Sequence, residues 1–299
     1  MKEYSYQERH MGTDVTISIV TRSETKAFRI AQELFKNLSE YEERFSRFLE
    51  TSELSILNKT KTLSVSSDFM TVLKRSIELS ELTDKAFNPL VQVSSLGYSQ
   101  DIKATKAITN KIKTYNYNTD LNELEIDAAT HTVQLAPDQQ LDFGGLLKGY
   151  LANKLANQVI KQHPDLGGII INIGGDIATR GLDEIHEPFI FLLHNPVTGE
   201  DTPVAINDKS LASSGTYARY WQTNAGEKHH IVDSQTKNNP TNQLVAVSII
   251  HQDGAFSEAL TKLFLVRGYE EAVTIMSPSE NNYQYFCVLE NGQTISNIV

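Results

Sequence analysis

The chain has 299 residues, of which 40% are hydrophobic and 21% are charged, a composition typical of a globular protein that can bury a large core around an enclosed site. Lysine and arginine number 27 against 37 aspartate and glutamate residues, giving a net charge of -10, and the sequence contains no run of basic residues. This balance argues against a nucleic-acid partner, because binding a polyanion requires a local basic patch.

The first part of the chain predicts one strand followed by helices. Residues 13–20 (TDVTISIV) alternate polar and apolar side chains, which indicates a half-buried strand. Apolar residues recur at helical spacing over residues 27–41, so we expect a helix there. A loop and a short helix are predicted over residues 45–58, and a second long helix over residues 67–82, which ends before Pro89.

The middle of the chain contains two glycine pairs. Residues 99–140 are polar and predict only a hairpin around residues 124–135. The segment that follows, residues 141–160 (LDFGGLLKGYLANKLANQVI), is expected to form a tight Gly-Gly turn that leads into a helix. Residues 167–181 (GGIIINIGGDIATRG) predict an apolar strand that ends in a second turn, Gly-Gly-Asp.

The last part of the chain mixes both kinds of element. Strands are predicted over residues 189–193 and 244–250, then a helix over about residues 256–266 and a final strand. This mixture predicts an α+β (mixed α/β) fold in which sheets are flanked by helices. Because the sequence shows no interdomain linker, we expect residues 1–299 to form a single domain.

Cysteine usage and the N-terminus bear on the compartment. The one cysteine, Cys287, lies in an apolar run and is expected to be a small buried core residue, which excludes a disulfide framework or a cysteine metal site. No segment has the roughly 18 to 20 apolar residues of a membrane span. Residues 1–6 contain no apolar segment and no lipid-anchoring cysteine, which favours a cytoplasmic protein; an extracytoplasmic protein whose signal or lipoprotein leader was removed would look the same.

The first glycine pair is a candidate phosphate site. Gly144 and Gly145 stand at the expected N-terminus of a helix, where free N–H groups and the helix dipole favour an anion. Lys148 lies about one turn into that helix and can reach the same anion. Taken alone, a glycine pair is more often a plain turn and a lysine more often a surface residue, and neither glycine run is a Walker A or GxGxxG motif.

Other polar residues are candidates for acid–base or ligand roles. The spacing of His230 and Asp233 can bring a base and its orienting carboxylate together, although a strand-end histidine bound to solvent or backbone is an equally good interpretation. Asp142 and Asp176 each adjoin a glycine pair, where they either cap the turn or contact a ligand. Residues 213–216 (SSGT) offer hydroxyls but resemble ordinary Ser/Gly loops. These residues by themselves indicate an enzyme with a phosphate-bearing ligand and nothing more specific.

Seven segments occur in an order that matches a known protein family. They are MGT at 11–13; FSRFLETSELSILN at 45–58, like FSxYxPxSExxxLN; AFNP at 86–89, like FDP; LDFGGLLKGY at 141–150, like LDLGGIAKGY; NIGGDIATRG at 172–181; SSGTYARYW, like TSGDYERYF; and HIVDSQT, like HIIDPRT. One such segment arises easily by chance, whereas seven in order do not. Along nearly its whole length the chain therefore resembles the ApbE family, the FAD:protein FMN transferases.

The resemblance implies a substrate, a metal and a reaction. FAD would lie in an extended pocket with its diphosphate near a Mg²⁺ ion, and a threonine or serine hydroxyl of an acceptor flavoprotein would attack the FMN-side phosphorus while AMP leaves. Positioning and charge neutralisation supply most of the catalysis of such a phosphoryl transfer. By position, His230 would be the base, with Asp233 beside it. The residues implied to line the FAD site are Met11, Ala86, Phe87, Asn88, Asp142, Lys148, Asp176 and Ile231.

The metal motif departs from the family pattern. The family has approximately ADALAT, whose aspartate and threonine ligate Mg²⁺ together with a carbonyl of the glycine turn, whereas this chain has SEALTK at residues 257–262. Glu258 stands for the aspartate and Lys262 for the threonine, and a protonated lysine cannot ligate a metal. Either Lys262 displaces the ion, or Glu258, the Gly145 carbonyl and the FAD phosphates still hold it, assisted by Thr261. Of these two interpretations we favour the retained but altered site.

Three functions are compatible with these departures. The first, which we favour, is transfer of FMN to a Thr/Ser hydroxyl of an acceptor flavoprotein. The others are FAD binding with weakened transfer and Mg²⁺-dependent hydrolysis of FAD to FMN and AMP. Asn88, Thr216 and Ser234 also replace family residues, two aspartates and a proline, and are expected to alter acceptor recognition rather than FAD binding. The sequence specifies neither the acceptor, for which we expect a cytoplasmic protein, nor the oligomeric state.

Overall fold

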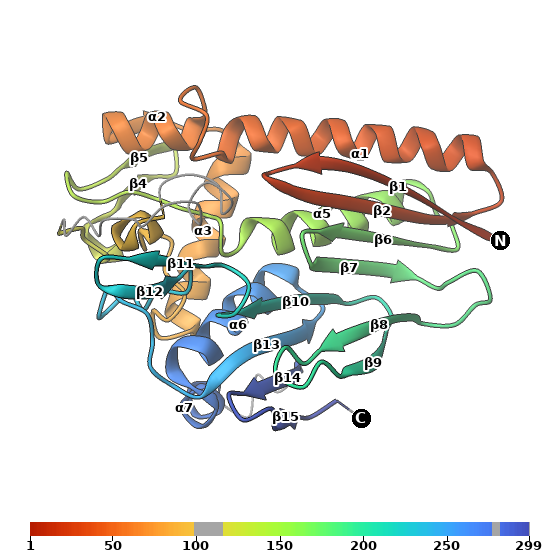
Figure 1. Cartoon of the computed structure of the whole chain (residues 1–299). Coiled ribbons are helices and arrows are strands. Elements are labelled where there is room, and N and C mark those ends of the chain that lie inside the picture. Colours follow the sequence, from red (N-terminus) through yellow and green to blue (C-terminus); the bar gives the residue numbers. More distant parts are fainter. Residues whose placement is uncertain (99–115, 277–281, 299) are drawn as a thin grey trace.

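The computed structural model describes residues 1–98, 116–276 and 282–298. Its main feature is an eight-stranded antiparallel sheet, in which strands far apart in the sequence lie side by side (Figure 1). In order of pairing, its strands are β1 (Lys2–His10), β2 (Thr13–Thr21), β6 (Gly168–Ile173), β7 (Asp176–Gly181), β10 (Ser210–Gly215), β13 (Leu244–His251), β14 (Gln284–Leu289) and β15 (Thr294–Ser296).

Smaller sheets and the helices complete the described structure. The small sheets pair β3 (Thr62–Ser64) and β4 (Glu125–Asp127) with β5 (Thr132–Gln134), β8 (Phe189–His194) with β9 (Asp201–Ile206), and β11 (Tyr220–Thr223) with β12 (Gly226–His229). The α-helices are α1 (Glu24–Phe45), α2 (Glu53–Thr60), α3 (Ser67–Leu82), α5 (Leu147–Gln162), α6 (Gly254–Arg267) and α7 (Tyr269–Ile275). None of the helices in these ranges combines the length and the apolar character that crossing a bilayer would need.

The large sheet separates two cores. On one face, α5 packs against β6 and β7 and α6 against β10 and β13, while α1 covers β1 and β2 (Figure 1). The main core fills the space between these helices and the sheet. A smaller core lies on the other face under β8 and β9. Because side chains alternate along a strand, neighbours in β13 enter different cores: Ile249 belongs to the main one and Ile250 to the smaller one.

Helix α6 is buried on almost every side. Residues 254–261 and 263–266 are all buried. Asp253 caps its start, accepting hydrogen bonds from the N–H of Ala255 at 2.8 Å and of Phe256 at 3.3 Å. Glu258 therefore carries its carboxyl group inside the protein, where an ionised group needs a partner to offset the loss of its hydration.

Helices α5 and α6 approach each other most closely at two glycines. A Cβ added to Gly149 would lie 2.4 Å from the carbonyl oxygen of Gly254, and one added to Gly254 would lie 2.2 Å from that of Gly149. Only a residue without a side chain fits at either place. The contact brings Glu258 to the start of α5, where its Oε1 accepts a hydrogen bond from the N–H of Gly149 at 3.1 Å.

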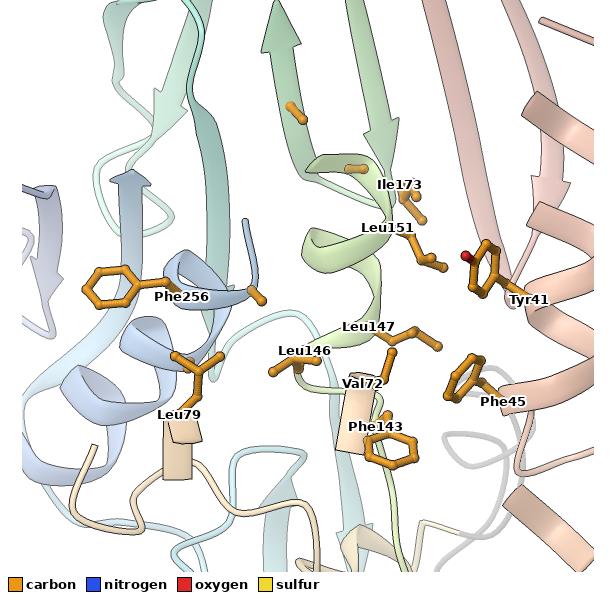
Figure 2. Packing of buried hydrophobic residues seen from close by; sticks show 14 of the residues in the cluster. Tyr41, Phe45, Val72, Leu79, Phe143, Leu146, Leu147, Leu151, Ile173 and Phe256 are labelled. Atoms are coloured by element: carbon orange, nitrogen blue, oxygen red, sulfur yellow. The ribbon is translucent and has the colours of Figure 1, made fainter. Parts of the chain in front are cut away.

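Apolar residues fix the start of α5 in the main core. Phe143, Leu146 and Leu147 are each less than 5% exposed. Figure 2 shows them among buried residues of the neighbouring helices, including Phe45 of α1 and Phe256 of α6. The rings of Phe143 and Phe45 meet edge to face with centroids 5.7 Å apart. The glycine turn enclosed by these residues is thereby held in place.

The α+β fold predicted from the sequence is confirmed, and α3 has the predicted bounds. The hairpin predicted near residues 124–135 is β4–β5, and residues 99–115 of that polar stretch lie outside the described part.

Two of the secondary-structure predictions were wrong. No strand was expected before residue 13, yet β1 is present; it lies at the sheet edge with mostly exposed polar side chains, so it lacks the alternation that marks a buried strand. Residues 213–216 were interpreted as a loop, although β10 is an interior strand ending at Gly215.

The buried position of Cys287 in β14 is confirmed, and it predicts a thiol that is inert in the native protein. Burial raises the pKa of Cys287 to about 12, so the reactive thiolate is present in only about one molecule in ten thousand at pH 8. We expect native protein to show no rapid reaction with Ellman's reagent at pH 8 and denatured protein to react with one equivalent. Fast stoichiometric labelling of the native protein would contradict this packing.

Candidate functional site

The turn between β6 and β7 presents Asp176. Gly174 and Gly175 have φ values of 63° and 100°, as a two-residue hairpin turn that matches the twist of its strands requires. Ile173 and Asp176 are direct partners across this turn. A Cβ on Gly174 would lie 2.5 Å from Oγ1 of Thr13, so the turn packs against the first residue of β2. The predicted Gly-Gly-Asp turn is confirmed, and its aspartate is buried at the start of β7.

Four charged side chains from α5, β7 and α6 meet beside this turn. Lys148 Nζ forms an ion pair with Asp176 Oδ2 and lies 3.5 Å from Glu258 Oε1. Lys262 Nζ lies 2.8 Å from Glu258 Oε2. The side chains of Glu258 and Asp176 are 1% and 4% exposed, against 15% and 16% for Lys148 and Lys262. The two lysine side chains are thus the more exposed members of the cluster, and the two carboxylates with which they pair are almost fully buried.

The charges in this cluster shift one another's titration. Burial, together with the neighbouring Glu258, raises the pKa of Asp176 to about 7, against the opposing effect of Lys148. Burial also acts to raise the pKa of Glu258, but the ammonium groups of Lys148 and Lys262 outweigh it and hold that pKa below its usual value. Burial acts to lower the pKa of Lys148, which the two carboxylates nevertheless raise. At neutral pH Glu258 and Lys148 are therefore ionised, and the cluster offers positive charge to an anion.

The glycine turn before α5 lies against the same cluster. A Cβ on Gly145 would lie 3.4 Å from Cε of Lys262 and 3.6 Å from Cε2 of Phe87. The backbone N–H of Asp142 donates to the carbonyl of Pro89 at 2.7 Å, which joins this turn to the AFNP segment. The structure therefore brings together three of the segments singled out in the sequence. Lys148, expected to reach an anion at this turn, pairs with Asp176 and Glu258, and its contact with an anion stays a prediction.

Asp142 caps its turn, which is one of the two roles expected for it. Its Oδ1 accepts a hydrogen bond from the N–H of Gly144 at 2.8 Å, and its Oδ2 forms an ion pair with Arg47. The Arg47 guanidinium also lies 5.0 Å from the ring centroid of Phe48 and 5.1 Å from that of Tyr98. Sequence reasoning missed Arg47, although it lies in the FSRFL segment; a cation among aromatic residues was the available signal.

The expected pairing of His230 with Asp233 is wrong. Asp233 accepts hydrogen bonds from the N–H of Gln235 at 3.0 Å and from Oγ1 of Thr236 at 3.2 Å, and it lies 3.7 Å from the Arg267 guanidinium. These contacts stabilise the turn after β12, and over the described residues no hydrogen bond or ion pair joins the Asp233 carboxylate to the imidazole of His230. Nδ1 of His230 is buried and has no hydrogen-bond partner among the described residues.

The surroundings of His230 are cationic. The backbone N–H of His230 donates to the backbone carbonyl of Arg219 at 3.2 Å, which places these two residues side by side. Burial, and after it the positive charges of Arg219 and Lys262, hold the pKa of His230 well below its ordinary value. The imidazole is therefore neutral near pH 7 and can accept a proton. Arg219 was not singled out in the sequence, although it lies in the SSGTYARYW segment.

The other predicted FAD-site residues lie around these segments. Ala86, Phe87, Asn88 and Ile231 are buried, and Met11 has a left-handed φ of 53° with its N–H donating to Glu42 at 2.9 Å. The side-chain amide of Asn88 bonds to the backbone: its Oδ1 accepts from the N–H of Leu90 and its Nδ2 donates to the carbonyl of Thr119, each at 2.9 Å. Contact of these residues with FAD stays a prediction.

Comparison with known proteins identifies the family. The model of the ApbE family matches residues 11–287. The chain belongs to the ApbE family. Among its relatives are the FAD:protein FMN transferases of Klebsiella pneumoniae (strain 342), 26% identical over 93% of this chain and 87% of that protein, and of Treponema pallidum (strain Nichols), 27% identical over 92% of this chain and 82% of that protein.

Solved structures agree with this assignment at the level of the fold. The ApbE protein from Thermotoga maritima superposes with a TM-score of 0.86 at 20% identity, covering 99% of this chain and 97% of that chain. The flavin transferase ApbE from Vibrio cholerae superposes with a TM-score of 0.78 at 21% identity and the same coverage. This member of the ApbE family therefore has the fold that the sequence resemblance implied.

The Mg²⁺ ion that the resemblance to the ApbE family implies does not fit the residues present. Both carboxylate oxygens of Glu258 are already bound, Oε1 by the N–H of Gly149 and Oε2 by the Lys262 ammonium. The Thr261 hydroxyl donates to the carbonyl of Glu258 at 2.7 Å and is fully buried. Over residues 1–98, 116–276 and 282–298, no three His, Cys, Asp or Glu side chains are placed to hold a metal. Mg²⁺ is usually bound by one or two carboxylates together with waters and substrate phosphates. Here the one carboxylate of the implied set, Glu258, is paired with Lys262, so these contacts do not match the retained metal site that we favoured from the sequence.

Proposed function

We propose that this protein is an FAD:protein FMN transferase, which moves the FMN half of FAD to a threonine or serine hydroxyl of an acceptor flavoprotein and releases AMP. The observation that carries the proposal is the pair of ammonium groups, Lys148 and Lys262, held by buried carboxylates next to the glycine turn. Such a cluster suits the diphosphate of FAD, because fixed cations neutralise phosphate oxygens. The relatives that carry this name match most of this chain.

The reaction forms one bond and breaks one. The acceptor hydroxyl oxygen bonds to the FMN-side phosphorus, the bond from that phosphorus to the bridging oxygen breaks, and AMP leaves with the bridging oxygen. The hydroxyl proton passes to His230, whose neutral imidazole has a free Nδ1. Lys148 and Lys262 offset the charge that develops on the phosphate oxygens, and this stabilisation of the transition state supplies much of the rate.

The remaining FAD contacts belong to the same proposal. We assign the nucleotide and flavin parts to the segments that converge on the cluster. The residues proposed to line this site are Met11, Ala86, Phe87, Asn88, Asp142, Asp176 and Ile231. Gly145 contributes through its backbone, since Lys262 and Phe87 leave little room for a side chain there. Asp176 and Glu258 act by positioning the two ammonium groups.

The decisive test incubates the protein with FAD and a purified flavin-acceptor domain that carries a target threonine. We expect intact-mass spectrometry to show one covalently attached FMN per acceptor, release of AMP, and no adduct on the same domain with alanine in place of the threonine. Release of FMN and AMP without an adduct would favour hydrolysis and contradict the proposal. Intact bound FAD without turnover would favour a flavin carrier and would contradict it as well.

Replacing the proposed base tests the mechanism separately. The His230→Gln variant should transfer FMN about 10²- to 10⁴-fold more slowly, because a positioned base typically contributes that much, while its affinity for FAD stays close to that of the wild type. Single-turnover transfer rates and FAD titrations measure the two quantities. An Asp233→Asn variant serves as the matched control: the carboxylate that it replaces bonds to Gln235 and Thr236 rather than to the imidazole, so the variant should transfer at a rate far closer to wild type.

A further inference from the structure

The position of Lys262 is set by the helix that carries it. Glu258 and Lys262 are four residues apart in α6, so they lie on the same face one turn apart. The ammonium is 2.8 Å from Glu258 Oε2 and donates to Oγ of Ser214 in β10 at 3.2 Å. Ser214 is itself held by the Thr261 hydroxyl at 2.9 Å. An ordered carboxylate and an ordered hydroxyl therefore fix the ammonium in one place.

That place lies between the groups from which the sequence resemblance builds a metal site. The stem of Lys262 runs past Gly145, where a Cβ would approach its Cε to 3.4 Å. Its Nζ donates to Oε2 of Glu258, so it competes with a metal ion for that oxygen. Oε1 of Glu258 is engaged as well, because it accepts a hydrogen bond from the N–H of Gly149 and lies 3.5 Å from Nζ of Lys148.

The charges of the cluster also disfavour a divalent cation beside Glu258. Lys148 and Lys262 already place two positive charges against the carboxylates of Asp176 and Glu258. A divalent cation added at Glu258 would meet an ammonium at contact distance, and like charges at such a distance repel strongly in a buried site. An incoming anion, in contrast, is attracted by both ammonium groups. The cluster is complete for binding a diphosphate without a metal ion.

We infer that the ammonium of Lys262 replaces the divalent cation in this protein and binds an oxygen of the FAD diphosphate directly, so that FAD binding does not depend on Mg²⁺. The inference rests on the proposed function and concerns the same site. A lysine acts on phosphate as a point charge with hydrogen-bonding capacity, and it needs no ligand set of its own. It is also a permanent part of the chain, so chelators do not remove it.

The test measures FAD affinity by quenching of flavin fluorescence, with millimolar Mg²⁺ and with EDTA. The wild-type Kd should agree between the two conditions within about a factor of two. The Lys262→Met variant, which keeps the apolar stem and removes the charge, should bind FAD about 10- to 100-fold more weakly in EDTA, as expected for loss of a charged hydrogen bond. Lys161→Thr, at an exposed position near the end of α5, is the control and should bind as wild type does.

A double variant tests the converse, that oxygen ligands in place of Lys262 make FAD binding depend on Mg²⁺. Glu258→Asp with Lys262→Thr replaces the internal cation by oxygen ligands and should convert FAD binding to dependence on Mg²⁺. If wild-type binding is lost in EDTA and restored by Mg²⁺, the inference is overturned and the proposed function stands. If Lys262→Met binds FAD in EDTA as tightly as wild type, the inference is likewise overturned. Absence of FAD binding by the wild type in both conditions would overturn both proposals.

Discussion

Replacing Lys148 by methionine is expected to lower kcat/KM for FMN transfer by about 10²- to 10³-fold, the loss typical of removing one preorganised charge-stabilising group. Lys148 is the cation shared by both buried carboxylates, Asp176 and Glu258. Methionine fills a similar volume, so the change removes charge rather than packing. The carboxylates then face a bound diphosphate with only Lys262 to offset their charge, and the phosphoryl group meets a less positive site.

The control for this variant lies in the same helix. Lys154 is also paired within the protein, 2.8 Å from Asp68, but it contacts none of the clustered residues. Lys154→Met should lower the melting temperature because Asp68 loses a partner, yet it should leave the transfer rate within about a factor of three, as expected of a site distant from the chemistry. Transfer by Lys148→Met within tenfold of the wild type would show that its ammonium does not act on the reacting phosphate.

Replacing Gly149 by alanine should be the most damaging small substitution in α5. Its Cβ would lie 2.4 Å from the carbonyl oxygen of Gly254 and 2.9 Å from Cγ of Glu258, so α5 and α6 must separate. We expect the free energy of unfolding to fall by about 3 kcal/mol, the upper part of the usual range for overpacking, even though alanine favours a helix by about 1 kcal/mol over glycine. The separation would also move Glu258 and Lys262, and FMN transfer should fall with stability.

Urea denaturation followed by circular dichroism measures this effect. Gln158→Ala, on the exposed side of the same helix, is the matched control and should change the free energy of unfolding by no more than about 0.5 kcal/mol. If Gly149→Ala proves as stable as the wild type, or more stable, helix propensity outweighs the clash. The close approach of the two helices would then not be what sets the position of Glu258.

The elements predicted best were those whose side chains repeat with a clear period. Helix α3 was predicted over residues 67–82 and is found there, because its apolar residues recur at helical spacing and Ser66 caps its start. Both glycine turns were also foreseen. In contrast, β1 carries mostly exposed polar side chains and gives no such signal. The hydroxyls of β10 suggested a loop, although its Ser213 bonds to Ser248 of the adjacent strand.

For the site, the sequence by itself determined the segments, the family and the departure at Lys262, because these are properties of residue type and order. Tertiary structure decided the partners. Lys148 meets Asp176 from 28 positions away and Arg47 meets Asp142 from 95 positions away, whereas Asp233 bonds to Gln235 and Thr236 instead of the nearby His230. Ion pairs and hydrogen bonds depend on distance and direction in space. Spacing along the chain limits those quantities only within one helix or strand, so the pair Glu258 and Lys262 could be foreseen and the others could not.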